Sequence, residues 1–353
     1  MEWMLGNIKS FSVGYPFFGI RFMLRHLVVL LLMLQLAACA TAPAGFIIDS
    51  PPRPTPLHPI TIKKSPVIGI ALGGGATRGF AHIGVLNALE QNGIVPDIVV
   101  GTSAGAVVGV LYAGGIRGAK LADIAQQLNR SQVVDWSYSG RGFILGELLQ
   151  KYINNMLDDR SIETLPTVFA ATATNLKTGE LAVFTRGEAG LAVRASSTIP
   201  GLVSPVNING DDYVDGGLVS KVPVRVARQL GADIVIAVDV SLLPRDRVVL
   251  DGTFAVMEQA IAILSQAVIA NDLRNADVVI RPDIGVVPLG SFDFKEHSIN
   301  AGERAAVAAI PQIKRLLAAR RKRGEKKSRR PEQQNNSATP AQAPAQAPLL
   351  RLP

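Results

Sequence analysis

The stretch Val99–Gly109, which reads VVGTSAGAVVG, organises the rest of the chain. A β-branched apolar run stops at Gly101, and a helical pattern of small residues begins directly after Ser103. A strand that turns into a helix within about two residues forces strained dihedral angles on the corner residue. Side chains at Gly101 and Gly105 would collide with the neighbouring strand and the following helix. Ser103 would then present an open hydroxyl at the positive end of the helix, which favours a nucleophile.

Length and charge narrow the class of protein. A chain of 353 residues that is 48% hydrophobic can bury one large α/β domain or two smaller ones. The net charge of +8 is concentrated at the ends, with +2 in residues 1–38 and +7 in residues 319–353. Residues 39–318 are nearly neutral. We therefore do not expect a nucleic-acid-binding domain.

The N-terminal segment has the features of an export signal. Arg25 and His26 precede the apolar run Leu27–Leu36, which is too short to span a bilayer comfortably. The ending Leu36–Cys39 resembles the lipobox of bacterial lipoproteins, which implies that residues 1–38 are removed and that Cys39 is lipidated.

By the same resemblance, Ala40 after the cysteine favours the outer membrane. We therefore expect a lipoprotein of the cell envelope that faces the periplasm. The alternative is a short signal anchor, or a start at Met23 instead of Met1. Cys39 is the single cysteine, so a disulfide within the chain is impossible.

Composition divides the rest of the chain into three parts. Residues 39–66 are rich in proline and are expected to form an extended tether. Residues 67–318 form the predicted catalytic domain. Residues 319–353 are basic and then rich in Pro, Ala and Gln, which predicts a disordered tail that anionic lipid head groups would attract.

A glycine-rich loop, Gly73–Gly79, follows the apolar strand 67–72 and precedes a helix that ends at Asn92. Backbone amides that converge at a helix N-terminus form an anion site. A dinucleotide fingerprint would need glycine at Arg78, and a P-loop would need Gly-Lys-Ser/Thr, which is absent. We favour an oxyanion hole built from the amides of Gly74 and Gly75, with Ala76 as a further candidate donor.

The remaining pattern alternates near-continuous apolar strands with helices. This predicts an α/β fold with three layers, α/β/α, in which helices cover both faces of a mostly parallel sheet. The periodic segment 145–157 could cap the site, although an ordinary packed helix fits the pattern better. The expected strands are 67–72, 98–100, 167–174, 181–185, 234–240 and 278–280, and the later helices are 189–197, 254–269 and 301–317.

A second candidate site residue lies in Tyr213–Gly217, which reads YVDGG. A strand that ends in Asp215 and continues into Gly216 and Gly217 indicates a loop whose backbone passes close to another segment. Asp-Gly is also a common hairpin turn signal, and Asn209–Asp212 just before it is predicted to be such a turn.

Together these motifs resemble the patatin-like phospholipases, over about residues 66–318. The resemblance rests on five segments in this order: Gly73–Gly79, Gly93–Asp97, Gly101–Gly105, Ala195–Gly201 and Asp215–Gly217. It implies the patatin-like fold and a lipid acyl hydrolase. Ser103 would be the nucleophile and Asp215 its partner, and Gly73, Gly74 and Gly75 with Arg78 would form the oxyanion loop. Gly79, Gly105, Gly216 and Gly217 complete the matching motifs.

The positions of the histidines favour a catalytic dyad of Ser103 and Asp215 over a Ser-His-Asp triad. His58 lies in the tether, His297 in a late loop, and His82 on the helix after the glycine loop, where a structural role is the better interpretation. Asp215 would therefore act as the base, and burial in an apolar pocket would raise its pKa towards a useful value.

The predicted function is hydrolysis of carboxylic esters in phospholipids or lysophospholipids, with membrane lipids as substrates. No cofactor is expected, and one cysteine with scattered histidines offers no metal site. Two alternatives stay open. One is a membrane-tethered scaffold or regulatory protein that keeps the fold without turnover, and the other is an esterase, thioesterase or peptidase with other substrates.

Overall fold

The computed structural model describes residues 51–328 apart from residues 63, 139, 247–251 and 289. Of the two compact units into which the chain divides, the described residues belong to one. The predicted signal peptide 1–38, the lipidation site Cys39 and the first part of the expected tether lie outside them, as do residues 329–353.

The described residues form a central sheet of eight strands in the order β5-β6-β3-β2-β1-β7-β8, with β4 paired to β3 outside this path. Neighbouring strands from β3 through β2, β1 and β7 to β8 are parallel, whereas β4, β5 and β6 make antiparallel pairs. The strands are β1 Ile68–Leu72, β2 Ile98–Thr102, β3 Val168–Asn175, β4 Leu181–Phe184, β5 Val206–Ile208, β6 Asp211–Asp215, β7 Ile234–Val238 and β8 Val278–Ile280.

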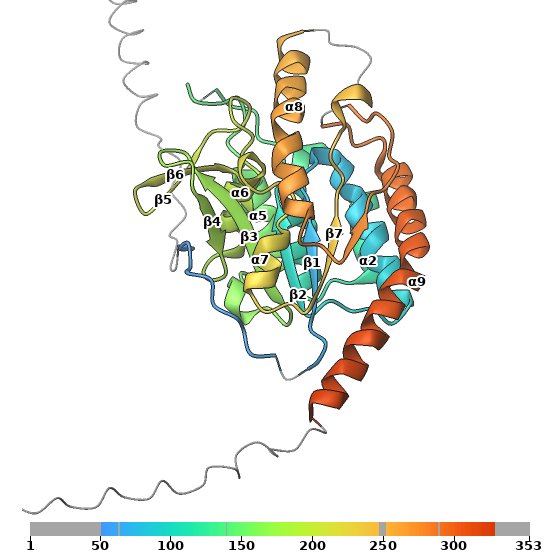
Figure 1. Ribbon diagram of the computed structural model, residues 1–353. Coiled ribbons are helices and arrows are strands. Elements are labelled where there is room, and N and C mark those ends of the chain that lie inside the picture. The colour runs from blue at the N-terminus through green and yellow to red at the C-terminus, as the bar shows by residue number, and fades with distance from the viewer. Residues whose placement is uncertain (1–50, 63, 139, 247–251, 289, 329–353) are drawn as a thin grey trace, which may run out of the picture. The chain divides into compact units, whose positions relative to one another are not determined.

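Helices cover both faces of this sheet (Figure 1). The predicted α/β fold, a mostly parallel sheet with helices on either side, is therefore confirmed. The helices are α2 Ala81–Gln91, α3 Ala104–Ala113, α4 Gly118–Gln127, α5 Glu147–Met156, α6 Ala189–Ser196, α7 Val224–Gln229, α8 Thr253–Leu273 and α9 Lys295–Ser328.

The central strands are apolar because both of their faces are covered. Every residue of β1, β2 and β7 is buried. On one face, α7 packs its valines Val224 and Val226 onto a cluster that includes Ala71, Val100 and Val235. On the other face, α3 approaches the sheet at Gly109. Burial of each such side chain contributes about 1.5–3 kcal/mol, so these strands form a firm base for the loops at their ends.

Two glycines let α2 and α9 cross at close range. A Cβ atom built on Gly84 would lie 1.9 Å from the carbonyl oxygen of Ile299, and one built on Gly302 would lie 2.0 Å from that of Ala81. Side chains at these positions would hold the helices apart. The crossing therefore fixes α2, and with it the preceding glycine loop, to α9.

The prediction of an extended tether over residues 39–66 is wrong for its second half, because this part of the chain packs on the domain. The amide of Thr55 donates to the carbonyl of Val183 on β4 at 2.9 Å, and the amide of Ile60 donates to that of Leu230 at 2.9 Å. Leu57 packs against the apolar cluster under α7. Apolar residues among the prolines give this segment a surface to bury, and an open strand edge tolerates proline.

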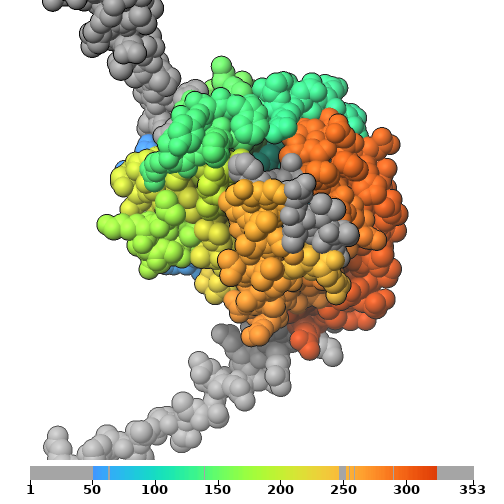
Figure 2. Space-filling model, turned by 90° about the horizontal axis from the view of Figure 1, so that it is seen from above, coloured from blue at the N-terminus to red at the C-terminus, as the bar shows by residue number. Residues whose placement is uncertain are grey.

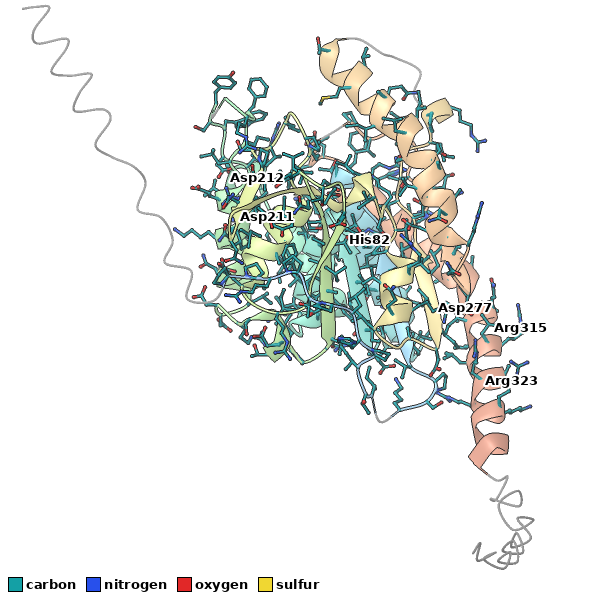
Figure 3. All side chains as sticks on the ribbon, turned by 60° about the vertical axis from the view of Figure 1, so that its left-hand side comes forward. His82, Asp211, Asp212, Asp277, Arg315 and Arg323 are labelled. Carbon is teal, nitrogen blue, oxygen red and sulfur yellow. The ribbon has the colours of Figure 1, made fainter. Side chains whose placement is uncertain are left out.

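The disordered tail was also predicted to begin too early in the chain. The closing helix was expected over 301–317 and disorder from residue 319, but α9 runs to Ser328. Arg, Lys and Ala favour helices, so a basic composition does not by itself end one. Arg315 and Arg323 project from the lower part of α9 away from the sheet (Figure 3).

Two smaller expectations concern local elements. The predicted turn is confirmed, because Asn209 and Gly210 have positive φ angles of 56° and 93° between β5 and β6. Helix α5 contributes no residue to the cavity described below, so the interpretation as an ordinary packed helix is confirmed. Among the described helices, none combines the length and apolarity that crossing a bilayer requires.

Candidate active site

Ser103 stands at the corner between β2 and α3 with φ 54° and ψ −124°, a costly conformation for a residue with a side chain. Its hydroxyl does not cap the helix. A Cβ atom built on Gly105 would lie 2.1 Å from the carbonyl oxygen of Leu72 on β1, and one on Gly101 would lie 2.4 Å from that of Gly105. The predicted strain and the need for both glycines are confirmed.

Strand register brings Asp215 to the level of Ser103. Thr102, the last residue of β2, pairs with Thr172 on β3. The next residue of β3, Ala173, pairs with Asp215. Strand β3 thus continues beyond the end of β2, and β6 returns antiparallel along this extension. Asp215 and Ser103 therefore meet across β3, although their strands run in opposite directions.

The carboxylate of Asp215 is buried and held in place. It accepts a hydrogen bond from the amide of Gly217 at 2.7 Å, and the Ser103 hydroxyl lies near enough to lower its pKa. Burial raises the pKa of Asp215, while the Lys221 ammonium, the Ser103 hydroxyl and the Gly217 amide each lower it; the net direction is upward. A carboxylate with a raised pKa is a better proton acceptor for a serine than an ordinary aspartate.

The backbone after Asp215 runs close against β3, as predicted. A Cβ atom built on Gly216 would lie 2.4 Å from the carbonyl oxygen of Thr172. The Thr102 hydroxyl shares a 2.7 Å hydrogen bond with the Thr172 hydroxyl and donates to the carbonyl of Ser220 at 3.0 Å. These contacts join the Asp215 turn to the two strands that carry the corner.

The glycine loop lies beside the corner, but the prediction for Gly74 is wrong. The Gly73 amide donates to the carbonyl of Val238 at 2.9 Å, and the Gly74 amide donates to that of Lys221 at 3.0 Å. Gly74 is therefore occupied in holding the loop to the segment after Asp215. Gly75 and Ala76 line the cavity next to Ser103 and are the remaining candidate oxyanion donors.

Two further loop residues, Arg78 and Gly79, hold the loop against its neighbours. A Cβ atom built on Gly79 would lie 2.4 Å from the Cβ atom of Ala104, so glycine lets the loop contact the start of α3. The buried Arg78 guanidinium donates to the carbonyls of Val240 at 2.8 Å, Ser241 at 3.4 Å and Gly285. Arg78 thus ties the loop to the segments after β7 and β8, and its implied oxyanion role becomes a structural one.

His82 supports the glycine loop through a hydrogen bond to its backbone. Its Nε2 lies 2.8 Å from the carbonyl oxygen of Gly73 and must donate to it, and burial lowers its pKa to about 4. The ring lies inside the molecule on α2 (Figure 3). Its Nδ1 has no hydrogen-bond partner among the described residues, so no carboxylate orients this ring as a catalytic triad requires. The structural interpretation of His82 is therefore supported.

The end of α6 and the residues just after it hold both candidate catalytic residues by their backbones. The Ser103 amide donates to the Ser196 hydroxyl at 2.9 Å, and the Asp215 amide donates to the carbonyl of Thr198 at 2.8 Å. The sequence indicated this segment only through its resemblance to the family motif Ala195–Gly201. Its hydroxyl residues just before Pro200 were the available signal.

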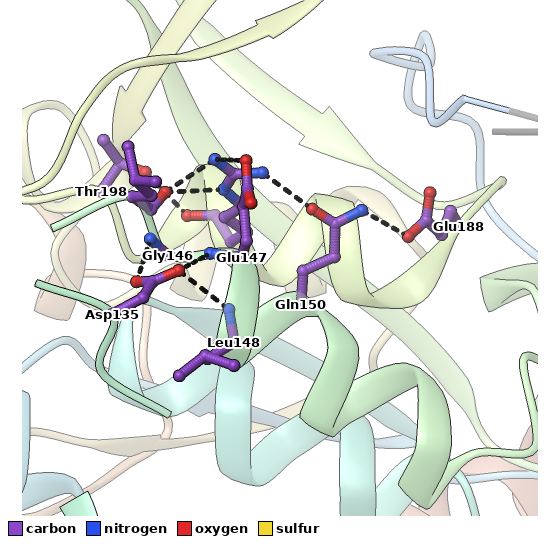
Figure 4. A network of polar contacts seen from close by, with 9 residues as sticks. Asp135, Gly146, Glu147, Leu148, Gln150, Glu188 and Thr198 are labelled. Atoms are coloured by element: carbon purple, nitrogen blue, oxygen red, sulfur yellow. Dashed lines mark hydrogen bonds and ion pairs between the residues drawn. The ribbon is translucent and has the colours of Figure 1, made fainter. Parts of the chain in front are cut away.

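A partly buried polar network fixes α6 against α5 (Figure 4). The Arg194 guanidinium donates twice to the carbonyl of Leu145, at 2.7 and 3.0 Å, and once to the Gln150 amide oxygen at 3.0 Å. The Thr198 hydroxyl donates to the carbonyl of Arg194 at 2.9 Å. Asp135 accepts the first backbone amides of α5. The segment that grips Ser103 and Asp215 is therefore itself rigid.

A cavity of about 110 Å³ opens above Ser103 and Asp215. The glycine loop forms one end, and the rest of its wall is largely apolar. Helix α8 contributes Met257, Ile261, Ala262 and Ser265 to its wall. Seen from above, this face of the molecule has a hollow between residues coloured green and residues coloured orange (Figure 2). The apolar lining residues include Ile199, Pro200, Leu218, Leu242, Met257 and Ile261.

Two charged residues that the sequence analysis missed complete the site. Asp272 on α8 accepts the amide of Val222 at 2.9 Å and the hydroxyl of Ser220 at 3.3 Å, and burial raises its pKa to about 6. Lys221 lies between those two residues and lines the cavity. A carboxylate near the end of the otherwise largely apolar α8 was the available signal for Asp272. Among the described residues, no cluster of His, Cys, Asp and Glu could hold a metal ion.

Comparison with known proteins adds to this geometry. An NTE family protein of Mycobacterium tuberculosis is 35% identical over 193 residues, which are 54% of this chain and 53% of that protein. Lysophospholipase NTE1 of Coccidioides immitis is 34% identical over 188 residues, 50% of this chain and 12% of that protein. The chain thus spans about half of the mycobacterial relative and a small part of the fungal one.

Among solved structures, VipD from Legionella pneumophila aligns with a TM-score of 0.48 and 12% identity, over 76% of this chain and 71% of that one. Residues 70–228 match the family model described as patatin-like phospholipase. This matched region contains the glycine loop, the Ser103 corner and Asp215–Gly217. Residues 70–228 are therefore identified as a patatin-like phospholipase domain.

Proposed function

We propose that this chain is a serine lipid acyl hydrolase that cleaves carboxylic esters of phospholipids or lysophospholipids. The observation that carries the proposal is that strand register brings Ser103 and the buried carboxylate of Asp215 together in the wall of one largely apolar cavity. The family match and the lysophospholipase relative support lipid ester hydrolysis.

In the first half-reaction, the Ser103 oxygen attacks the ester carbonyl carbon and Asp215 accepts the hydroxyl proton. The carbonyl oxygen becomes an oxyanion, which the amides of Gly75 and Ala76 and the N-terminus of α3 would stabilise. Loss of one such donor typically costs about 3 kcal/mol of transition-state stabilisation. The tetrahedral intermediate then collapses, and the leaving alkoxide takes the proton from Asp215.

In the second half-reaction, a water molecule attacks the acyl-enzyme while Asp215 again accepts a proton. Collapse of the second intermediate releases the fatty acid and returns the proton to Ser103. The apolar residues Leu218, Met257 and Ile261 along the cavity give the acyl chain a surface to bury.

Two variants and one control test the dyad. Ser103→Ala should abolish ester turnover and covalent labelling by a fluorophosphonate probe, and Asp215→Asn should reduce both nearly as far. Asp211, an exposed carboxylate at the other end of β6 (Figure 3), is the matched control, and Asp211→Asn should behave as wild type. The acid limb of kcat/KM should lie above the ordinary aspartate pKa of 3.8, because Asp215 must be ionised to act.

The outcomes separate the alternatives. A fully folded wild type that neither reacts with the probe nor cleaves any ester would favour the scaffold. Probe labelling together with turnover of thioesters or soluble esters, but not of lipids, would favour the other esterase classes. Full activity of Ser103→Ala would refute the dyad itself.

We also propose that Cys39 is lipidated after removal of residues 1–38, which would anchor the domain in the cell envelope with membrane lipids within reach. Mass spectrometry of the mature N-terminus should find acyl groups on Cys39. Cys39→Ser should move the protein from the membrane fraction to the soluble fraction. An unmodified, membrane-bound N-terminus would overturn this proposal.

A further inference from the structure

The cavity above Ser103 is lined by two cations among the described residues, Arg78 and Lys221. The Arg78 guanidinium is occupied by backbone carbonyls, as described above. Lys221 differs, because its partly buried ammonium makes no hydrogen bond or ion pair within the described part of the chain. A partly buried ammonium whose hydrogen-bond donors are unused has lost hydration, so it favours a ligand with anionic acceptor atoms.

Its position places this ammonium close to the reacting groups. A Cβ atom built on Gly74 would lie 3.6 Å from the Lys221 Nζ and 3.3 Å from the Ser103 Cβ. A Cβ atom built on Gly217 would lie 3.4 Å from the same Nζ and 2.9 Å from the Asp215 Oδ1. The ammonium therefore lies between the glycine loop and the Asp215 turn, and its charge acts on the Asp215 carboxylate.

The backbone around Lys221 is fixed on three sides. Its own carbonyl accepts the Gly74 amide at 3.0 Å. The preceding carbonyl, of Ser220, accepts the Thr102 hydroxyl at 3.0 Å, and the following amide, of Val222, donates to Asp272 at 2.9 Å. The side chain is therefore aimed into the cavity by contacts that do not involve its ammonium group. Such preorganisation lowers the entropic cost of binding a ligand.

We propose that Lys221 binds the phosphate of a phospholipid or lysophospholipid whose acyl ester lies at Ser103. This inference rests on the proposed function and narrows its substrate class to acyl esters that carry a phosphate on the same glycerol. In such lipids the phosphate lies only a few bonds from the scissile carbonyl, so one cation beside the nucleophile can reach it. Among the described lining residues, the cations are Lys221 and Arg78, and Arg78 already donates three hydrogen bonds to backbone carbonyls.

A substrate pair tests the assignment: lysophosphatidylglycerol and monoacylglycerol with the same acyl chain, each presented in neutral detergent micelles. Wild type should favour the phosphate-bearing lipid. Lys221→Met should lower the ratio of kcat/KM for lysophosphatidylglycerol over monoacylglycerol by about 10- to 100-fold, as expected for loss of one charge-assisted hydrogen bond. Lys221→Arg should restore most of the ratio. Lys177→Met, which removes an exposed lysine, is the matched control and should leave the ratio unchanged.

An equal loss on both substrates would overturn the inference, because Lys221 would then act on the catalytic groups or on the fold. An unchanged ratio in Lys221→Met would overturn it as well. Equilibrium binding of an ether analogue of lysophosphatidylglycerol, which has no ester, separates this inference from the proposed function. If no ester is cleaved but the analogue binds at least tenfold more weakly to Lys221→Met, the hydrolase proposal fails and the phosphate site stands. Inorganic phosphate that competes as well as the lipid would instead indicate a site for free phosphate.

Discussion

Replacement of Gly105 by alanine gives a direct test of how the nucleophile corner is built. The new Cβ atom would lie 2.1 Å from the carbonyl oxygen of Leu72, whereas ordinary van der Waals contact begins at 3.4 Å. Relief of this overlap needs a shift of about 1.3 Å, and both partners are backbone: α3 and the buried strand β1. Helix and strand would have to separate at the position of Ser103.

The chain offers a matched control one turn later on the same helix. A Cβ atom on Gly109 would meet only side-chain atoms, of Val99 at 3.1 Å, Phe169 at 3.2 Å and Leu72 at 3.4 Å. Alanine favours a helix over glycine by about 1 kcal/mol. Gly109→Ala should therefore stay within about 1 kcal/mol of wild type. Gly105→Ala should be destabilised by about 1–3 kcal/mol, the usual cost of overpacking, because its clash cannot relax cheaply.

The assay combines urea denaturation with the rate of fluorophosphonate labelling. A displacement of about 1 Å at a reacting group can cost a factor of about 100, so labelling of Gly105→Ala should slow by roughly that amount. Labelling of Gly109→Ala should keep the wild-type rate. If the two variants show the same stability and the same labelling rate, the close approach of α3 to β1 does not set the position of Ser103.

Two further predictions follow from buried polar contacts. Ser196→Ala should lower the free energy of unfolding by about 1–3 kcal/mol and slow the labelling of Ser103, because the buried Ser103 amide loses its acceptor; a wild-type labelling rate would contradict this role. Asp272 has a folded-state pKa of about 6, above its ordinary 3.8, so its contribution to stability is present below about pH 4 and is lost as the pH rises through about 6. Asp272→Asn should remove this part of the pH dependence of Tm, and an identical slope in both proteins would refute it.

The parts of the fold that the sequence predicts well are local. The strand, corner and helix around Ser103 follow from a β-branched run, two glycines and a small-residue helix, all within a few residues. The parallel centre follows in the same way, since strands covered on both faces are apolar throughout. The β5–β6 turn needed only Asn209 and Gly210, which accept positive φ angles.

The parts that it does not predict depend on long-range pairing. A strand pattern ending in Asp215 does not reveal that β6 runs antiparallel to β3, because register depends on the partner strand. The packing of residues 54–60 on β4 and on the cluster under α7 could not be read from a proline-rich composition. Nor does basic composition show where α9 ends, since Lys and Arg suit both a helix and a solvated tail.

In the candidate site too, local motifs predict some residues, whereas others depend on long-range contacts. Ser103 and Asp215 are visible from their motifs, whereas their supports come from distant segments: Ser196 for the Ser103 amide and the Lys221 carbonyl for Gly74. The oxyanion prediction failed at Gly74 because the loop pattern identifies converging amides but not which of them are already bonded. Lys221 could not be found by the same route, because only the folded chain places its ammonium beside the nucleophile.

The grip of Ser196 and Thr198 on the two backbones has a mechanical consequence. The strands that carry the serine and the aspartate are not neighbours, since β3 runs between them. Thermal twisting of the sheet would otherwise vary the gap between hydroxyl and carboxylate. One short clamp spans that gap and anchors both sides. The distance between the Ser103 hydroxyl and the Asp215 carboxylate, on which proton transfer depends, therefore changes little when the sheet twists.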